Sequence, residues 1–167
     1  DFPLPDFLAD ELSRAVREGK NQYAPMSGIP ALRQAIAAKT LDCYGRRVDP
    51  DSEITVTSGG SEAIFDAVLA VVCAGDEVIV LDPCYDCYEP AIDLAGAKAV
   101  HVALDPDDFS VDWRKVRDAV SPRTRMIFIN TPHNPSGAML DVEDMAELSA
   151  IVLDTRLDFA LEGTESL

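Results

Sequence analysis

The sequence predicts an α/β fold of three layers, in which a mostly parallel sheet lies between two layers of helices. Short runs of Val, Ile and Leu, such as residues 77–81 and 125–129, alternate along the chain with amphipathic helical patterns. These runs are apolar at almost every position, which is typical of strands that are covered on both faces. Such strands belong mainly to parallel sheets, because the helices that connect parallel strands pack against the faces of the sheet.

Apolar periodicity and the positions of Gly and Pro define the elements in order. Residues 5–18 place Leu8 and further apolar residues on one face of a helix, and Gly19 ends it. A loop rich in Gly, Pro and Asn leads to a second amphipathic helix over residues 30–44, which ends at Gly45. Strands and helices then alternate: strand 53–57, helix 61–73, strand 77–81, short helix 86–95, strand 98–103, helix 111–120, strand 125–129 and helix 141–153.

Length and charge restrict the class of protein. A chain of 167 residues is long enough for one domain, or for most of one. It has 30 acidic and 14 basic residues and a formal net charge of −16. Since this charge repels phosphate groups, we expect neither a nucleic acid nor an anionic membrane as a partner. We also expect no signal peptide or transmembrane span, because the most apolar stretch, residues 67–75, is too short to cross a bilayer.

The four cysteines show no disulfide-rich spacing, so we expect a cytoplasmic protein. Cys84 and Cys87 form a C-x-x-C motif, which in other settings serves redox chemistry or binds zinc. A zinc site needs two further ligands, and His101 and His133 are not suitably spaced. We therefore expect no metal site and interpret Cys84 and Cys87 as two incidental cysteines in a turn and the first helical coil, with redox or metal chemistry as the alternative.

Three loops that follow predicted strands carry the candidate functional residues. The carboxyl ends of parallel strands meet at one edge of the sheet, where ligands bind. The first loop runs from Ser58 and opens a helix, and Gly59 and Gly60 let the backbone approach a ligand closely. The free N–H groups at the start of the helix favour an anion. The alternative is a tight turn in which Ser61 only caps its helix.

The other two loops add an aromatic ring and an amide. Tyr85 in the second loop can stack on a flat cofactor, or Tyr85 and Tyr88 are half-buried cover residues. In the third loop, the Asn134-Pro135 pair predicts a cis or sharply turned peptide that points the Asn134 amide into the cleft as a donor. The neighbouring His133 is expected to be a loop histidine without a role in proton transfer.

Several segments, in this order and spacing, closely resemble class I/II aminotransferases of pyridoxal 5′-phosphate (PLP) fold type I, and most closely the methionine- and kynurenine-aminotransferase-like subgroup: NQYAPMSGIPALRQAIA, EITVTSGGSEAI, GDEVIVLDPCYDCYEPAI, VDW and RMIFINTPHNPSGAML. The resemblance covers about residues 1–153. It implies part of the aspartate-aminotransferase-like large domain over residues 31–153, preceded by an N-terminal helix and interface loop over residues 1–30. Residues 154–167 form a tail that does not follow the family pattern.

The resemblance also implies the residues that hold PLP. Gly59, Gly60 and Ser61 would bind its phosphate through backbone and hydroxyl groups. Tyr85 would stack on the pyridine ring, and Asn134 would donate to the phenolic oxygen.

A sixth residue, Tyr23, would reach the phosphate of the neighbouring subunit's cofactor, so the resemblance implies a homodimer. The implied reaction moves an amino group from an amino acid to a 2-oxo acid.

The family's Schiff-base lysine is not matched in this sequence. The lysines present are Lys20, Lys39, Lys98 and Lys115, and none lies in the family's Ser-x-x-Lys-like segment. We therefore assign no catalytic residue and expect an inactive fragment, which also begins without Met. One alternative is a non-catalytic module that keeps the cleft, and another is a nucleotide-binding domain, which lacks its G-x-G-x-x-G motif here.

Overall fold

The structure is a computed structural model that describes residues 2–155 and, for the backbone alone, residues 158–162. The chain divides into two compact units, Asp1–Thr57 and Ser58–Leu167. The predicted boundaries at residues 30 and 153 lie elsewhere and stay a prediction.

The first unit contains two helices at the predicted positions, α1 (Asp6–Arg17) and α2 (Pro30–Tyr44). Pro30 lies at the start of α2, where its missing N–H costs no hydrogen bond, and the helix ends at Gly45 as expected. No residue of α1 is buried, so the apolar face that the sequence predicts is exposed in this chain.

A buried arginine ties the loops of the first unit together. The Arg33 guanidinium donates to the carbonyl oxygen of Gly28 over 3.2 Å and to the Asp51 carboxylate over 3.0 Å, and it also donates to the carbonyl oxygen of Pro50. Only 7% of Arg33 is exposed, and each of its contacts is a charge-assisted hydrogen bond. The chain before α2 and the chain after it are therefore held to the same side chain.

The predicted strand over residues 53–57 is wrong. These residues are not part of a strand among the described residues, although the Val56 N–H donates to the Ser27 carbonyl over 3.1 Å. A strand needs a continuous ladder of hydrogen bonds with a partner, and a single bond to a loop does not supply it. The β-branched composition that suggested a strand reflects the packing of Val56 against Gly28.

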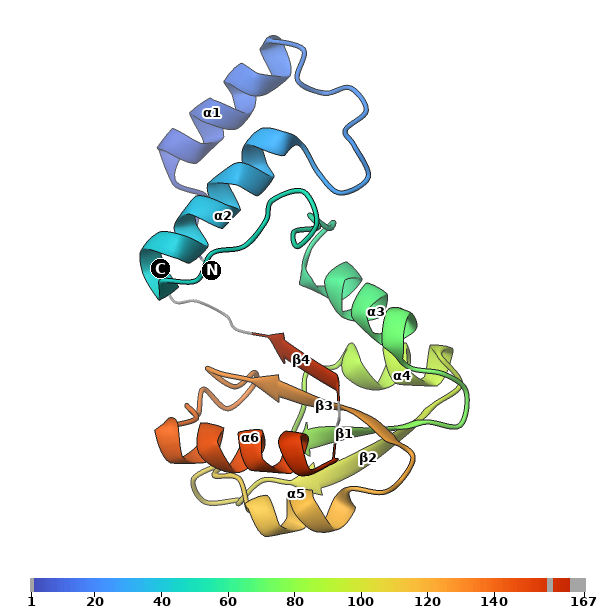
Figure 1. Cartoon of the computed structure of the whole chain (residues 1–167). Coiled ribbons are helices and arrows are strands. Elements are labelled where there is room, and N and C mark those ends of the chain that lie inside the picture. Colours follow the sequence, from blue (N-terminus) through green and yellow to red (C-terminus); the bar gives the residue numbers. More distant parts are fainter. Residues whose placement is uncertain (1, 156–157, 163–167) are drawn as a thin grey trace. The chain divides into compact units, whose positions relative to one another are not determined.

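The second unit is a parallel four-stranded sheet in the order β2-β1-β3-β4, with helices on both faces (Figure 1). This confirms the predicted fold class. The strands are β1 (Glu77–Asp82), β2 (Lys98–Ala103), β3 (Thr124–Asn130) and β4 (Asp158–Glu162). The helices are α3 (Gly60–Val71), α4 (Tyr88–Leu94), α5 (Trp113–Ala119) and α6 (Val142–Thr155).

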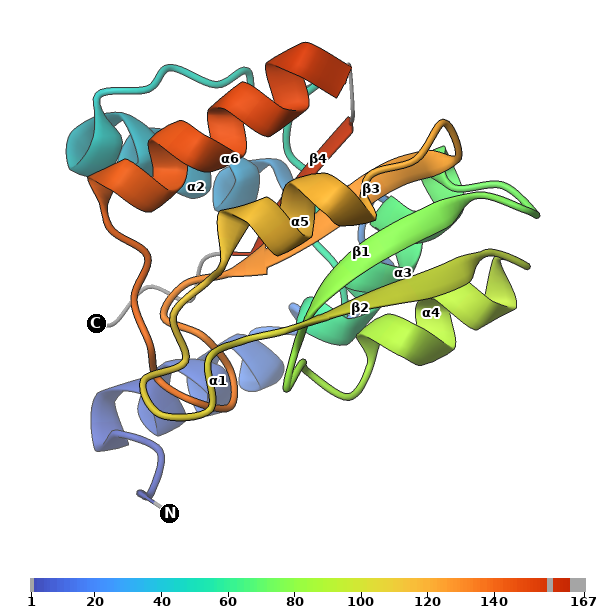
Figure 2. The same cartoon turned by 90° about the horizontal axis from the view of Figure 1, so that it is seen from below.

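Alternate residues of β1 and β3 enter two separate cores. Ile79 and Ile127 pack with α5 and α6 on one face, whereas Val80 and Phe128 pack with α3 and α4 on the other. Figure 2 shows the two pairs of helices on opposite sides of the sheet. Both central strands are buried on both faces, which explains why their sequences are apolar at almost every position.

The fourth strand lies where the sequence pattern predicts no element. Residues 158–162 read Asp-Phe-Ala-Leu-Glu, a short run with acidic residues at both ends that gives a weak strand signal. The backbone nevertheless pairs in parallel with β3 from Met126 to Asn130, which satisfies hydrogen-bonding groups that an edge strand leaves free.

The order of the strands places a crevice at the carboxyl ends of β1 and β3. The chain leaves β1 towards α4 on one face of the sheet, and it leaves β3 towards α6 on the other face. Loops that depart to opposite faces from neighbouring strands open a gap at the edge of the sheet, and ligands of open α/β proteins bind there. The second and third predicted loops are the two that border this gap.

A carboxylate network fixes the opposite end of β1. Glu77 is 5% exposed, and its carboxylate accepts from the Ser121 hydroxyl over 2.6 Å and from Arg123 Nη2 over 2.5 Å. These hydrogen bonds, from Ser121 first and then from Arg123, lower the pKa of Glu77 below its ordinary value. The network connects the start of β1 with the turn that leads into β3.

We predict that Glu77→Gln destabilises the chain at pH 7 and that the difference from wild type shrinks in acid. Because the folded-state pKa is lowered, the carboxylate stabilises the fold above its ordinary pKa of about 4.3, and this contribution is lost as the pH falls below that value. Urea unfolding at pH 7, 5 and 3.5 measures the effect. A difference that is constant across this range would contradict the assignment.

Candidate functional site

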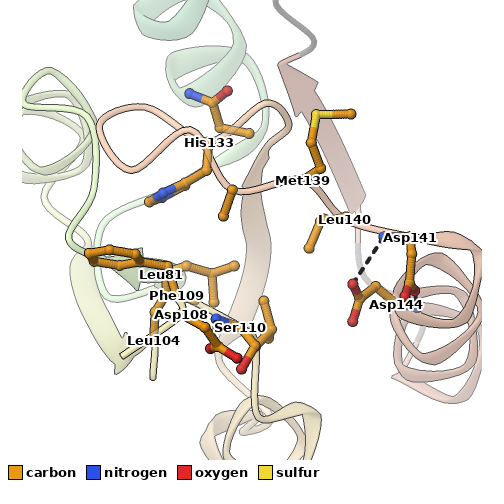
Figure 3. A pocket seen from close by; sticks show the side chains of 13 residues that line it. Leu81, Leu104, Asp108, Phe109, Ser110, His133, Met139, Leu140, Asp141 and Asp144 are labelled. Carbon is orange, nitrogen blue, oxygen red and sulfur yellow. Dashed lines mark hydrogen bonds between the residues drawn. The ribbon is translucent and has the colours of Figure 1, made fainter. Parts of the chain in front are cut away.

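A cavity of about 290 Å³ lies in the crevice at the carboxyl ends of β1 and β3 (Figure 3). Strand ends supply Leu81 and Asn130, and the loop after β3 supplies His133 and Met139. Asp144 of α6 also lines it, and its carboxylate accepts from the Trp113 indole N–H over 2.8 Å. The cavity therefore combines an apolar base with polar groups that are fixed by the fold.

Asn130 closes β3 and is a buried polar side chain, 7% exposed. Its Nδ2 atom donates to the Tyr88 hydroxyl over 3.3 Å, but its Oδ1 atom has no hydrogen-bond partner among the described residues. Leaving a buried acceptor unpaired costs about 1–3 kcal/mol. The amide is thus suited to receive an N–H or O–H group from a polar ligand or from a neighbouring segment.

The aromatic side chains of the second loop form a stack against the sheet. The Tyr88 ring lies parallel to the Phe128 ring, with centroids 4.3 Å apart, and Tyr85 meets Tyr88 edge to face at 5.8 Å. Tyr88 is 3% exposed, whereas Tyr85 is half-buried. Tyr88 is therefore a core residue, and Tyr85 is the ring of this loop that remains accessible to a ligand.

The third loop is a compact turn. The His133 N–H donates to the Ala138 carbonyl over 2.7 Å, and the Gly137 N–H donates to the His133 carbonyl over 2.6 Å. The Asn134–Pro135 peptide is cis, which confirms the predicted turned conformation. Asn134 itself is exposed and is not among the residues that line the cavity.

The first loop leads directly into α3. Gly59 is the N-cap residue, with φ 95° and ψ 170°, and no side chain caps this helix end. Ser61 lies inside the helix, so the alternative in which it caps α3 is wrong. The Ser58 N–H donates to the Glu62 carboxylate, which links the turn to the first turn of α3. An uncapped helix start with a glycine before it has the backbone geometry of an anion site.

Tyr23 and His101 are the remaining residues that the sequence analysis named. Tyr23, in the first unit, is fully exposed and borders a shallow hollow with Asn21 and Gln22. His101 lies on β2, where its Nδ1 atom is 2.8 Å from the Asp82 carboxylate and its Nε2 atom is 3.5 Å from that of Glu89. His101 is exposed, and β2 is an edge strand of the described sheet.

The sheet brings the second and third loops together, because β1 and β3 are neighbours and Asn130 is hydrogen-bonded to Tyr88. The α3 helix packs on the same face as α4 through Ile64 and Val68. Sequence reasoning did not select Asn130 and Tyr88 as site residues. The sequence did contain one signal for Asn130, because it is a polar residue that directly follows the apolar run of residues 126–129.

The C-x-x-C motif has no sign of redox chemistry. All four cysteines are described, and none is disulfide-bonded. Burial, followed by the charge of Asp82, raises the pKa of the Cys84 thiol to about 11. A redox-active cysteine needs a lowered pKa, so this environment favours two incidental cysteines.

We predict that Cys84 reacts with a disulfide reagent about 100-fold more slowly than an ordinary exposed thiol at pH 8, because its thiolate fraction is smaller by roughly that factor. Exposed Cys43 and Cys73 serve as internal references. The rate at each cysteine is measured by timed labelling and mass spectrometry. Labelling of Cys84 as fast as that of Cys73 would refute the prediction.

Within residues 2–155 and 158–162, no group of three or more His, Cys, Asp or Glu side chains is arranged to hold a metal ion. None of the helices in the described part of the chain is long and apolar enough to span a membrane.

Comparison with known proteins gives a consistent result. The family model "Aminotransferase class I and II" matches residues 1–157. The methionine aminotransferase of Escherichia coli is 49% identical over 148 residues, which are 89% of this chain and 38% of that protein. The rat kynurenine–oxoglutarate transaminase 3 is 34% identical, over 92% of this chain and 36% of the relative.

Solved structures agree with these matches. A structure of an Escherichia coli protein with a methionine aminotransferase function superimposes with a TM-score of 0.91 and 45% identity, covering 98% of this chain and 43% of that one. The N-succinyldiaminopimelate aminotransferase of Mycobacterium tuberculosis gives a TM-score of 0.93 and 40% identity, covering 96% of this chain and 42% of that one.

The chain spans about two fifths of the length of the relatives that it matches. The family model nevertheless covers almost all of the present sequence, and the solved aminotransferase structures share its fold. The chain belongs to the class I and II aminotransferase family.

Proposed function

We propose that this chain forms the cofactor-holding part of a PLP-dependent aminotransferase, which transfers an amino group from an amino acid to a 2-oxo acid. The uncapped start of α3 is the observation that carries the proposal, because it offers backbone N–H groups and the positive end of the helix dipole to a phosphate. Gly59, Gly60 and Ser61 would bind that phosphate. When bound, PLP supplies an electron sink for bond cleavage at the substrate's α-carbon.

The two loops at the crevice would hold the ring of the cofactor. Tyr85 is half-buried, and its ring is held by an edge-to-face contact with the buried Tyr88 ring. Asn134 is exposed at the turn of the third loop and would donate to the phenolic oxygen of PLP. The unpaired Oδ1 atom of Asn130 supports the proposal, because a polar group of a ligand could donate to it.

A second subunit completes the site in this proposal. Tyr23 is fully exposed, as expected of a side chain that would reach the neighbouring subunit's phosphate. The exposed apolar face of α1, with Leu8 and Leu12, would be covered in a homodimer.

We further propose that the present chain does not turn over amino acids by itself, since none of its four lysines matches the family's Schiff-base segment. Without this lysine the site lacks both its covalent anchor and its proton carrier, and a missing general acid–base group alone slows catalysis about 10²–10⁴-fold. The test combines a transaminase assay with borohydride trapping of PLP, with a full-length methionine aminotransferase as the positive control.

We expect no turnover and no preferred lysine among the trapped adducts. Turnover together with specific trapping at Lys20, Lys39, Lys98 or Lys115 would overturn this part of the proposal.

A further inference from the structure

The imidazole of His101 on β2 lies between two carboxylates. Its Nδ1 atom is 2.8 Å from the Asp82 carboxylate, and its Nε2 atom is 3.5 Å from that of Glu89. A carboxylate only accepts hydrogen bonds, so the Nδ1–H group donates to Asp82. The longer distance to Glu89 exceeds that of a normal hydrogen bond but still brings the two groups into electrostatic contact. His101 therefore has one strong and one weaker partner.

The two carboxylates border the second loop at its two ends. Asp82 is the last residue of β1, and Glu89 lies in the first turn of α4. Residues 83–88 lie between them, and Tyr85 is one of these. One side chain from a neighbouring strand thus contacts the chain both where it enters this loop and where it leaves it.

The pleat of the sheet places these groups on the face that α4 covers. Val80 and Ala99 pack in the same core as the buried residues of α4, and Asp82 and His101 each follow two positions later on their strands. Residues two positions apart in a strand point to the same face of the sheet. Figure 2 shows α4 beside β2 on this face.

The position of Tyr85 depends on how this loop is held. Its carbonyl accepts from the Tyr88 N–H over 3.2 Å, and its ring meets the Tyr88 ring edge to face at 5.8 Å. Tyr88 directly precedes Glu89, so a contact that restrains Glu89 also restrains the residue on which Tyr85 rests. Holding a ring in place before a ligand arrives removes an ordering cost from binding.

We propose that His101 is a positioning residue that fixes both ends of the second loop and thereby holds the Tyr85 ring ready to stack on the cofactor. This inference rests on the proposed function, because it takes the pyridine ring as the partner of Tyr85. His101 acts through Asp82 and Glu89 and does not itself touch the ligand. Without the imidazole, the two carboxylates lose the group that lies between them, and their like charges favour an open loop.

The test is a double-mutant cycle between His101 and Tyr85, with pyridoxine 5′-phosphate, which lacks the aldehyde of PLP, as the ligand. Titration calorimetry gives the affinities. We expect Tyr85→Ala to weaken binding about tenfold, through the loss of one ring stack. His101→Leu should weaken binding about fivefold by itself, but by no more than about twofold when Tyr85→Ala is already present.

A merely structural role gives a different pattern. His101→Leu would then weaken binding by the same factor with and without the Tyr85 ring, and that result would overturn the inference. His101→Asn keeps an N–H donor near the position of Nδ1 and should restore part of the affinity through Asp82. Lys98→Gln is the matched control, because it changes an exposed residue at the other end of β2, and it should leave the affinity unchanged.

A ligand-free readout separates this inference from the proposed function. His101→Leu should speed amide hydrogen exchange at Tyr88, whose N–H donates to the Tyr85 carbonyl, by about fivefold. Exchange at Gly137 in the third loop should stay as in wild type. If the wild-type chain does not bind pyridoxine 5′-phosphate, the proposed function fails, while exchange at Tyr88 still decides whether His101 holds the loop. Unchanged exchange at Tyr88 would refute the inference in either case.

Discussion

Replacing Gly28 with alanine is expected to destabilise the first unit by about 3 kcal/mol. Two costs combine at this position. Gly28 has φ 94°, which L-residues rarely adopt, and an added Cβ atom would lie 2.6 Å from both Cβ and Cγ2 of Val56. Backbone strain of this kind costs roughly 1–2 kcal/mol, and overpacking costs about 1–3 kcal/mol. The Gly28 carbonyl also accepts from Arg33, so a shift of the loop disturbs the buried guanidinium.

Urea unfolding and amide exchange of the first unit measure this effect, and two variants separate its causes. Gly45→Ala is the control for backbone strain, because Gly45 has φ 65° and open space around its Cβ position. It should cost about 1 kcal/mol. Gly28→Ala combined with Val56→Gly, which removes both Cβ and Cγ2 of residue 56, should recover the steric part alone when it is compared with Val56→Gly. If Gly28→Ala costs no more than Gly45→Ala, the close approach of Val56 is not what selects glycine.

Gly59→Ala is expected to weaken binding of pyridoxine 5′-phosphate by about 10- to 100-fold. The Gly59 backbone has φ 95° and ψ 170°, a region that is essentially restricted to glycine and costs other residues roughly 1–3 kcal/mol. No atom lies within 4 Å of an added Cβ, so the effect acts through the backbone alone. The strained turn would move the first N–H groups of α3 away from the phosphate.

The control for this variant is Gly75→Ala, which has a similar φ of 90°, equally open surroundings and a position in the loop before β1. Both variants should lose similar stability, but Gly75→Ala should bind the ligand as wild type does. Titration calorimetry compares them. Equal affinities for Gly59→Ala and wild type would show that the start of α3 does not hold the phosphate.

The sequence was sufficient to predict those strands and helices whose own residues already indicate how they are buried. The apolar runs of β1 and β3 predict strands buried on both faces, since each side chain finds a core on its own side of the sheet. Residues 53–57 have a similar composition but no partner strand among the described residues, and pairing is not encoded in a single segment. β4 is the reverse case: its sequence gives only a weak strand pattern, but its backbone pairs with the neighbouring strand β3.

The site could be predicted in part, for the same reason. Loop motifs indicate Gly59, Tyr85 and Asn134, because unusual residue types at strand ends suggest ligand contacts. The roles of Tyr88 and Asn130 depend on a hydrogen bond between residues 42 positions apart, which no local pattern contains. The local sequence does not distinguish Arg33 from other charged residues on a helix. Its guanidinium can be buried because the carbonyl oxygens of Gly28 and Pro50 accept from it.

The central claim is that the crevice at the carboxyl ends of β1 and β3 accepts a phosphorylated pyridine. An NMR titration of the chain with pyridoxine 5′-phosphate, compared with pyridoxine, tests it most directly. We expect saturable shift changes at Gly60, Ser61, Tyr85 and Asn134, and binding at least tenfold weaker for the ligand without phosphate. Equal binding of the two ligands, or shift changes that avoid the start of α3, would contradict it.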